Sequence, residues 1–137
     1  MELVALVGRL LFVIVFLGSG LGHLTNTAMM TGYAQSKKLP AAKAIVLISG
    51  VWIIVAALMV LFGVWVDLAA LMLFVFLLGT AFIFHNFWGE TDQQARMMEM
   101  TQFMKDLALA GAALLIFVFY GQFGDELGLT ITGPLFF

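Results

Sequence analysis

The sequence predicts an all-α membrane protein: one domain, residues 1–137, whose four transmembrane helices form an up-down-up-down bundle. Of the 137 residues, 64% are hydrophobic and 10% are charged, whereas soluble domains are about 45–50% apolar and about 25% charged. The apolar residues fall into four stretches, each near the ~20 residues that cross a bilayer as a helix. A chain this short cannot bury so much apolar surface away from water, so a soluble enzyme is excluded.

The predicted spans are residues 3–24, 41–62, 66–88 and 101–120, followed by a tail, 121–137. A cleaved signal peptide is the alternative for the first span. Such peptides begin with basic residues, whereas here Glu2 precedes the apolar run and Arg9 lies within it. Gly18 and Gly22 form a GxxxG motif, which favours close helix contact within the fold or in a homo-oligomer.

Short interfacial helices are expected in the two longer connections. Apolar residues within 29–33 recur at helical spacing before Pro40, which is expected to open the second span. Thr91 and Gln94 have capping-box spacing, so a helix is expected to begin near Asp92 and run into the fourth span. In the tail, the alternation over residues 129–132 predicts a strand-like segment, and the following Gly-Pro pair predicts a turn.

Basic residues in short loops predict the orientation. The two longer connections and the span starts beside them carry five basic residues, whereas Arg9 is the single one near the opposite ends of the helices. By the positive-inside rule, the longer loops are expected in the cytoplasm and both termini outside. The five residues are Lys37, Lys38, Lys43, Arg96 and Lys105.

Polar residues at lipid depth are the candidate site, because an unpaired charge in mid-bilayer costs at least about 2.5–3.5 kcal/mol. The ends of the first, third and fourth spans place a set of polar side chains at one membrane level. We expect this set to bind a ligand, exchange protons or tie the helix ends together. Its members are His23, His85, Asn86, Gln102, Lys105 and Asp106. At the other level, Arg9 and Asp67 are expected to form an ion pair, unless Arg9 extends to the interface. Trp52 and Trp88 are candidates to line a pocket, or belong to packing and the interfacial aromatic belt.

Several functions are excluded by what the chain lacks. It has no cysteine, which rules out disulfides and Cys-ligated metals, and its histidines form no zinc or haem motif. A net charge of −2 argues against nucleic-acid binding. No nucleophile elbow, phosphate loop or dinucleotide motif is present, so the sequence holds no self-sufficient active site and predicts no bound metal.

The landmarks together resemble the DoxX family of small bacterial membrane proteins. They occur in family order from residue 8 to about residue 120, and the His85-Asn86-Phe87-Trp88 run followed by Phe103-Met104-Lys105-Asp106 is the strongest. The other matching segments are residues 8–11, 18–24, 32–36, 39–40 and 50–63, with the last motif continuing to residue 109.

The resemblance implies a multi-pass protein of the bacterial cytoplasmic (inner) membrane, associated with oxidoreductases through relatives that are subunits of a thiosulfate:quinone oxidoreductase. It places the family's recurrent polar residues on Arg9, His85 and Lys105. The chain departs from the family near Ile53, where relatives often carry a glutamate, and at Asp106, where they often carry asparagine. The first departure weakens a relay that needs a mid-membrane carboxylate, and the second adds a proton acceptor beside Lys105.

Three functions stay open at this point. The leading hypothesis is a membrane subunit of a redox system that binds a quinone or another small hydrophobic ligand near the cytoplasmic helix ends, while a partner protein supplies the redox centre. The alternative is a non-enzymatic anchor or assembly factor for a soluble partner. A small transporter is the third, and it is disfavoured by the few buried charges.

Overall fold

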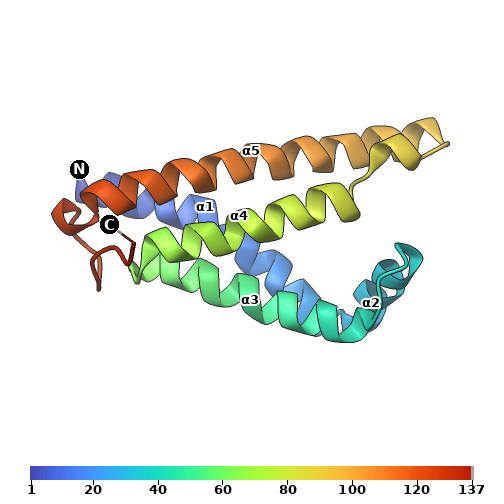
Figure 1. Ribbon diagram of the computed structural model, residues 1–137, viewed down its shortest axis with the longest axis horizontal. Helices are drawn as coiled ribbons and strands as arrows, with labels where there is room; N and C mark the ends of the chain where they lie inside the picture. Colours follow the sequence, from blue (N-terminus) through green and yellow to red (C-terminus); the bar gives the residue numbers. More distant parts are fainter. Residues whose placement is uncertain (137) are drawn as a thin grey trace.

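The computed structural model describes residues 1–136, and all regular elements in that range are helical. They are α1 (Glu2–Thr25), α2 (Thr27–Ser36), α3 (Ala42–Phe62), α4 (Val66–Ile83), η1 (Phe87–Gly89), α5 (Gln93–Phe123) and η2 (Gly124–Glu126). Helices α1, α3, α4 and α5 belong to four segments long and apolar enough to cross a membrane. The predicted all-α, four-span architecture is confirmed, and α2 is the short helix expected in the first long loop (Figure 1).

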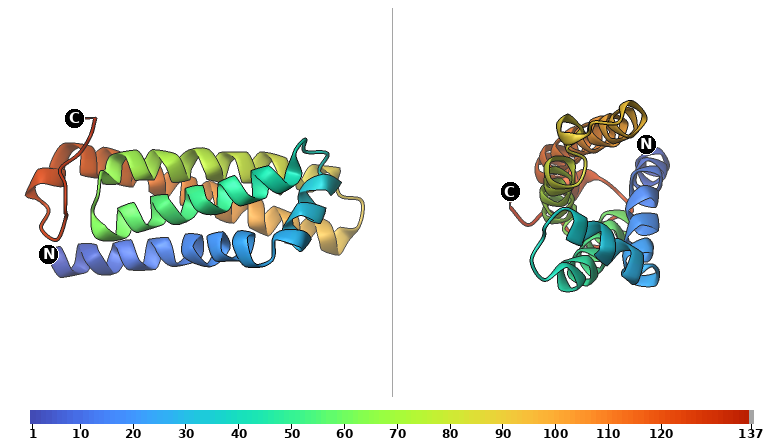
Figure 2. Two further views of the ribbon diagram at one scale, coloured as in Figure 1. Left: turned by 90° about the horizontal axis from the view of Figure 1, so that it is seen from below. Right: turned by 90° about the vertical axis from the view of Figure 1, so that its right-hand side faces the viewer.

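The long helices pack in a chain rather than a closed ring. Helix α1 packs on α3, α3 on α4 and α4 on α5, whereas α1 and α5 make no extended contact within residues 1–136. The end-on view in Figure 2 shows this order, and both chain ends lie at one end of the bundle. At the other end, α5 continues past α4, because its 31 residues span about 46 Å against about 27 Å for the 18 residues of α4.

Two glycines allow α1 and α3 to cross closely. A Cβ on Gly20 would collide with Ile54, and one on Gly50 would lie 2.7 Å from the Cβ of His23. A Cβ on Gly18 or Gly22 would meet nothing within 4 Å. The close contact is therefore made by Gly20 and Gly50 rather than by the predicted GxxxG pair.

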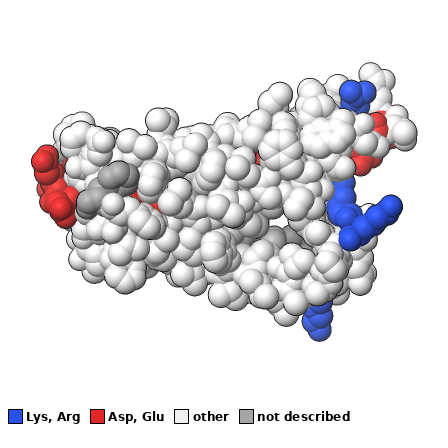
Figure 3. Space-filling view, viewed as in Figure 1, with Lys and Arg blue, Asp and Glu red and all other residues white. Residues whose placement is uncertain are grey.

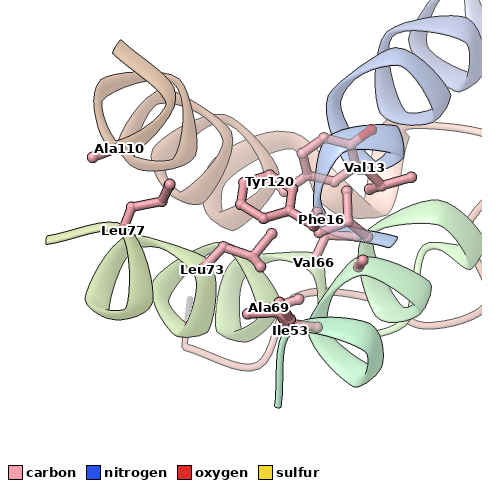
Figure 4. Close-up of a cluster of buried hydrophobic side chains, with 12 residues drawn as sticks. Val13, Phe16, Ile53, Val66, Ala69, Leu73, Leu77, Ala110 and Tyr120 are labelled. Atoms are coloured by element: carbon pink, nitrogen blue, oxygen red, sulfur yellow. The ribbon is translucent and has the colours of Figure 1, made fainter. Parts of the chain in front are cut away.

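The main core lies where the helices converge, toward the end that holds the chain termini. Figure 4 shows Val13 and Phe16 of α1, Val66 and Leu73 of α4 and Tyr120 of α5 in this cluster. Small side chains such as alanine recur in it and let the helices approach closely. Many large apolar side chains point outward instead, as lipid-facing surfaces require.

Two helix ends differ from the sequence prediction. Helix α5 begins at Gln93, close to the expected position, but its cap is Asp92, whose side chain accepts from the amide of Ala95 at 2.8 Å, and not Thr91. Helix α4 ends at Ile83 rather than near residue 88. The amides of residues 84 and 85 both bond to the carbonyl of Thr80 there, so His85 lies in the loop that follows.

The tail forms no strand within residues 127–136; it runs as bends across the end of the bundle. The amides of Ile131 and Thr132 donate to the carbonyl of Gly63, at 2.9 and 3.0 Å. The Thr132 hydroxyl oxygen accepts from the amide of Trp65 at 2.7 Å. The strand-like prediction is wrong because these amides pair with the α3–α4 turn and have no neighbouring strand. Phe137 lies outside the described residues.

Charged side chains gather at the two ends of the molecule. Figure 3 shows the basic side chains of this face at the end that holds α2 and the start of α5. Acidic side chains lie at both ends, and the surface between is almost free of charge. This distribution fits a bundle whose middle lies in lipid.

Candidate functional site

A cavity of about 430 Å³ lies between the helix pairs α1/α3 and α4/α5, in the half of the bundle that faces α2. Helices α1, α2, α3, α4 and α5 all contribute to its wall. Figure 3 shows the surface hollowed toward this end. The lining residues are Ser19, His23, Met30, Tyr33, Leu39, Ile45, Val46, Ser49, Val75, Phe76, Gly79, Thr80, Ile83, Phe84, His85, Lys105 and Asp106.

The cavity is mostly apolar, with its polar groups on two walls. Phe76, Phe84 and Tyr33 supply aromatic surface, and the rings of the last two lie 5.6 Å apart. A cavity of about 300–1,000 Å³ with apolar walls and a few polar groups is typical of small-molecule sites. Its volume and lining are therefore those of a small-molecule site.

His85 carries the polar wall formed by α4 and α5. Its Nδ1 lies 2.8 Å from Oε2 of Glu99, and its Nε2 lies 3.7 Å from Oδ2 of Asp106. Asp106 is only 5% exposed and also accepts a hydrogen bond from the Thr80 hydroxyl at 2.9 Å. The imidazole therefore stands between two carboxylates, an arrangement suited to holding or passing a proton.

Lys105 adds a cation at the edge of this wall. Its Nζ donates to the side-chain oxygen of Gln102 at 2.6 Å and lies 3.5 Å from Oδ1 of Asp106. The Lys105 side chain is 45% exposed, so the ion pair lies at the rim of the cavity rather than within it. The lysine compensates the charge of the buried carboxylate.

His23 carries the opposite wall, formed by α1 and α3. Its Nδ1 lies 3.1 Å from the carbonyl oxygen of Val46 and 2.9 Å from the Ser49 hydroxyl oxygen. The ring also meets Phe76 edge-on at 6.2 Å between centroids. These contacts fix the imidazole across the cavity from His85.

Helix α2 closes the cavity at the loop end. The Tyr33 hydroxyl reaches the carbonyl of Phe84 at 3.0 Å and Oε1 of Glu99 at 3.3 Å. Burial, followed by the negative charge of Glu99, raises the pKa of Tyr33 to about 12. Lys37 makes a second tie, donating to Oδ1 of Asn86 at 2.8 Å.

The structure brings together four predicted site residues, His23, His85, Lys105 and Asp106, around this cavity. Asn86 and Gln102 lie outside it and bond to the two lysines described above. The two candidate pocket tryptophans do not line this cavity, and their positions agree with the packing and aromatic-belt alternative.

Each tryptophan has another position. Trp52 is 42% exposed and belongs to a shallow apolar groove on the outer face of α3, where its Nε1 donates to the carbonyl of Met72 at 3.0 Å. Trp88, 54% exposed, packs on Phe82, Phe87 and Phe103 beyond the end of α4. Trp52 on α3 and Trp88 on η1 both lie on outward-facing surfaces, away from the polar walls of the cavity.

The predicted Arg9–Asp67 ion pair is also wrong: within residues 1–136 no N···O contact of 4.0 Å or less joins them. Both side chains are buried, at 3% and 0% exposed. Arg9 donates instead to the carbonyl of Leu129, and Oδ2 of Asp67 accepts from the amides of Leu135 and Phe136. The tail backbone thus bonds to both charges, to Arg9 at Nη2 and to Asp67 at Oδ2.

Sequence reasoning missed several cavity residues. Tyr33, Ser49 and Thr80 lie within apolar or interfacial helices, where a lone hydroxyl gives little signal. Glu99 was assigned to a loop helix, yet the length of α5 carries it alongside His85. Within residues 1–136, no cluster of three histidine or acidic side chains is arranged to hold a metal ion.

The sequence profile of DoxX matches residues 4–86. The chain belongs to the DoxX family. The matched stretch covers α1 to the loop that holds His85, and α5 with Glu99, Lys105 and Asp106 lies beyond it. No curated protein and no solved structure matched this DoxX protein.

Proposed function

We propose that this DoxX protein binds a quinone, or a hydrophobic ring compound of similar polarity, in the cavity between the two helix pairs. The observation that carries the proposal is the convergence of His23, His85 and Asp106 on one apolar cavity of about 430 Å³. The packing of four helices into a bundle does not require these three polar side chains to meet. Polar side chains at lipid depth cost free energy, so their presence there favours a functional role. A bound quinone supplies a ring that takes up electrons and protons.

The residues that line the cavity would contribute to quinone binding in different ways. The rings of Phe76 and Phe84 offer edge and face contacts to a flat ligand. His85, placed between Glu99 and Asp106, holds or moves a proton at its Nε2. Lys105 lies at the rim, 3.5 Å from the buried Asp106 carboxylate, and offsets its charge.

The ligand enters from the lipid. Val75 and Ile83 belong to the cavity wall, yet they are 62% and 43% exposed on the outer face of α4. Apolar residues that line a cavity and also face the bilayer form a path for a hydrophobic molecule. The opposite, aqueous side is closed by α2 through Tyr33 and Lys37.

In this proposal the protein is the membrane subunit of a redox system, and another protein supplies the electrons. The chain has no motif for a redox centre of its own, which supports the assignment of electron supply to another protein. The basic residues at the α2 end favour a cytoplasmic position for that end, and the partner docks there.

The test is the quinone content of protein purified from native membranes. Extraction of wild type, His85→Ala and Asp106→Ala should give quinone near one per wild-type chain, falling about tenfold or more in each variant, since a hydrogen bond to a charged group contributes roughly 1.5–3 kcal/mol. Trp88→Phe is the control, because Trp88 lies near the same end but outside the cavity. Equal quinone content in all four proteins would contradict the proposed site.

A second function, an anchor for a soluble partner, is favoured by one observation. The first turns of α5 project past the end of α4 and expose Met97 and Met98, at 61% and 65%. Flexible methionines on a surface suit contact with another protein. Photocrosslinking from Met98 in native membranes should capture one defined protein, and Leu115, 74% exposed on the lipid-facing part of α5, is the control position. Capture at both positions alike, or at neither, would count against the anchor.

A further inference from the structure

The shallow apolar groove on the outer face of α3 has a volume of about 440 Å³, and no residue lines both this groove and the cavity. Its one N–H group belongs to Trp52 and donates to the carbonyl of Met72 at 3.0 Å, so no side-chain donor is left for a ligand. The surface therefore suits an apolar occupant. The lining residues are Leu47, Ile48, Val51, Trp52 and Val55 of α3 and Met72 of α4.

The position of the groove along α3 matches one leaflet of a bilayer. The 21 residues of α3 rise about 32 Å, close to the ~30 Å thickness of the hydrocarbon core. Leu47 lies about 8 Å and Val55 about 20 Å from the start of the helix, so most of the groove belongs to the leaflet at the α2 end. An acyl chain of that leaflet can lie along it.

Free cations lie at the end of the groove that is nearest the lipid headgroups. Lys43 is exposed and precedes Leu47 by one helical turn, so the two side chains share a face of α3. Within residues 1–136, the ammonium groups of Lys43 and Lys38 have no hydrogen bond or ion pair, whereas those of Lys37 and Lys105 are bonded to protein side chains. Lys38 is also exposed, in the connection that leads into α3.

The charge around this end of the groove is positive. The sequence has no Asp or Glu from residue 3 to residue 66, so the charged residues of α2, α3 and their connection are Lys37, Lys38 and Lys43. Glu90, from the α4–α5 connection, lies 3.9 Å from Lys37 and leaves the other two lysines uncompensated. A lysine near the bilayer surface strengthens binding to anionic lipid by about fivefold.

We propose that this groove binds one anionic phospholipid. An acyl chain lies against Val51 and the ring of Trp52, and the headgroup phosphate accepts from the ammonium groups of Lys43 and Lys38. The apolar groove alone fits any acyl chain, so the lysines make the site selective for a negative headgroup. A second copy of the chain is disfavoured as the occupant, because a two-fold contact through this face brings two Lys43 side chains to one membrane level.

Trp52 reports on the occupant directly. The chain has three tryptophans, so Trp65→Phe with Trp88→Phe leaves Trp52 alone. This full-length protein is reconstituted in vesicles of phosphatidylcholine with increasing fractions of phosphatidylglycerol, and one lipid or the other carries bromine on its acyl chains to quench Trp52 fluorescence. The quenching curves should give phosphatidylglycerol an affinity about tenfold or more above that of phosphatidylcholine, since two lysines contribute.

Three further changes in this background separate the parts of the site. Lys43→Gln should lower the preference for phosphatidylglycerol about fivefold. Arg96→Gln should leave it unchanged and is the matched control, because Arg96 is an exposed cation at the same end of the molecule but on α5. Val51→Phe, at a position that is 52% exposed, fills part of the groove without entering the core and should weaken quenching by both lipids.

Each other outcome overturns the proposal in a different way. Equal quenching by the two brominated lipids removes the selectivity. An equal loss of preference in Lys43→Gln and Arg96→Gln assigns the effect to general surface charge. Unchanged quenching in Val51→Phe places the acyl chain elsewhere, and weak quenching by both lipids means that another occupant, such as a second copy, covers Trp52. None of these results depends on quinone content, so they are distinguishable from a failure of the proposed function.

Discussion

Arg9, in the first helix, donates a hydrogen bond from Nη2 to the backbone carbonyl of Leu129, 120 positions later in the chain, at 2.7 Å. The same tail segment bonds to Gly63 in the α3–α4 turn and to Asp67 at the start of α4. Residues 127–136 therefore tie α1, α3 and α4 together at the end that holds the chain termini.

Replacing Arg9 with leucine should loosen this tail. The change leaves the Leu129 carbonyl without its donor, and a hydrogen bond to a charged group contributes about 1.5–3 kcal/mol, so local opening should become about tenfold more frequent or higher. Amide hydrogen exchange over residues 130–136, which includes the bonded amides of Ile131 and Leu135, measures it. Arg9→Lys keeps a cationic donor and is the control. Unchanged amide exchange rates in Arg9→Leu would show that the tail does not depend on Arg9.

Replacing Gly50 with alanine should destabilise the bundle by about 1–3 kcal/mol, the usual effect of overpacking. The new Cβ would lie 2.7 Å from the Cβ of His23 and push α1 away from α3. Gly18→Ala has open space and should be neutral or stabilising by up to about 1 kcal/mol, because alanine favours helix. Reversible unfolding in mixed micelles measures both. Equal stability of the two variants would argue against close packing at Gly50.

Tyr33 should make the protein less stable as the pH rises from about 10 to about 12. Its pKa in the folded protein is about 12, against an ordinary value of 10.0. Between these values the folded state holds the proton and the unfolded state releases it, so the free energy of unfolding falls with rising pH. The contribution is complete below pH 10. Tyr33→Phe should show a shallower fall over this range in denaturant titrations, and identical slopes would contradict the assignment.

The α2 end should face the cytoplasm. The chain has no cysteine, so single cysteines report topology cleanly. In intact cells, a membrane-impermeant maleimide should label Asp125→Cys at the tail end and spare Lys38→Cys in the loop after α2, both of which are exposed positions. Permeabilised cells, in which both should react, are the control. Labelling of Lys38→Cys alone would invert the orientation.

The spans could be predicted because hydrophobic runs of membrane length have few other interpretations. Helix rotation could not, since both the core face and the lipid face of α3 and α4 are apolar and no polar stripe marks either. That is why Trp52 was taken as a pocket candidate although it faces outward. The early end of α4 was missed because Phe84 is as apolar as the helix before it.

Part of the candidate site could be predicted from the sequence. His85, Lys105 and Asp106 stand out as ionisable groups in apolar surroundings, and the structure places them on one cavity. Glu99 does not stand out, since it lies among polar residues of a loop helix. The Arg9–Asp67 prediction considered only side chains, whereas each of these charges is bonded by the backbone of a tail that no motif marks.

The order of helix packing has a mechanical consequence. With α1 on α3 and α5 on α4, the protein consists of two leaves that pack along α3 and α4 and share the main core near the chain termini. The tail joins the leaves at one end, and at the other end the hydrogen bonds of Tyr33 and Lys37 in α2 cross from one leaf to the other, beside the cavity that His23 and His85 line. Breaking these α2 bonds would let the leaves part at the cavity without unpacking either leaf.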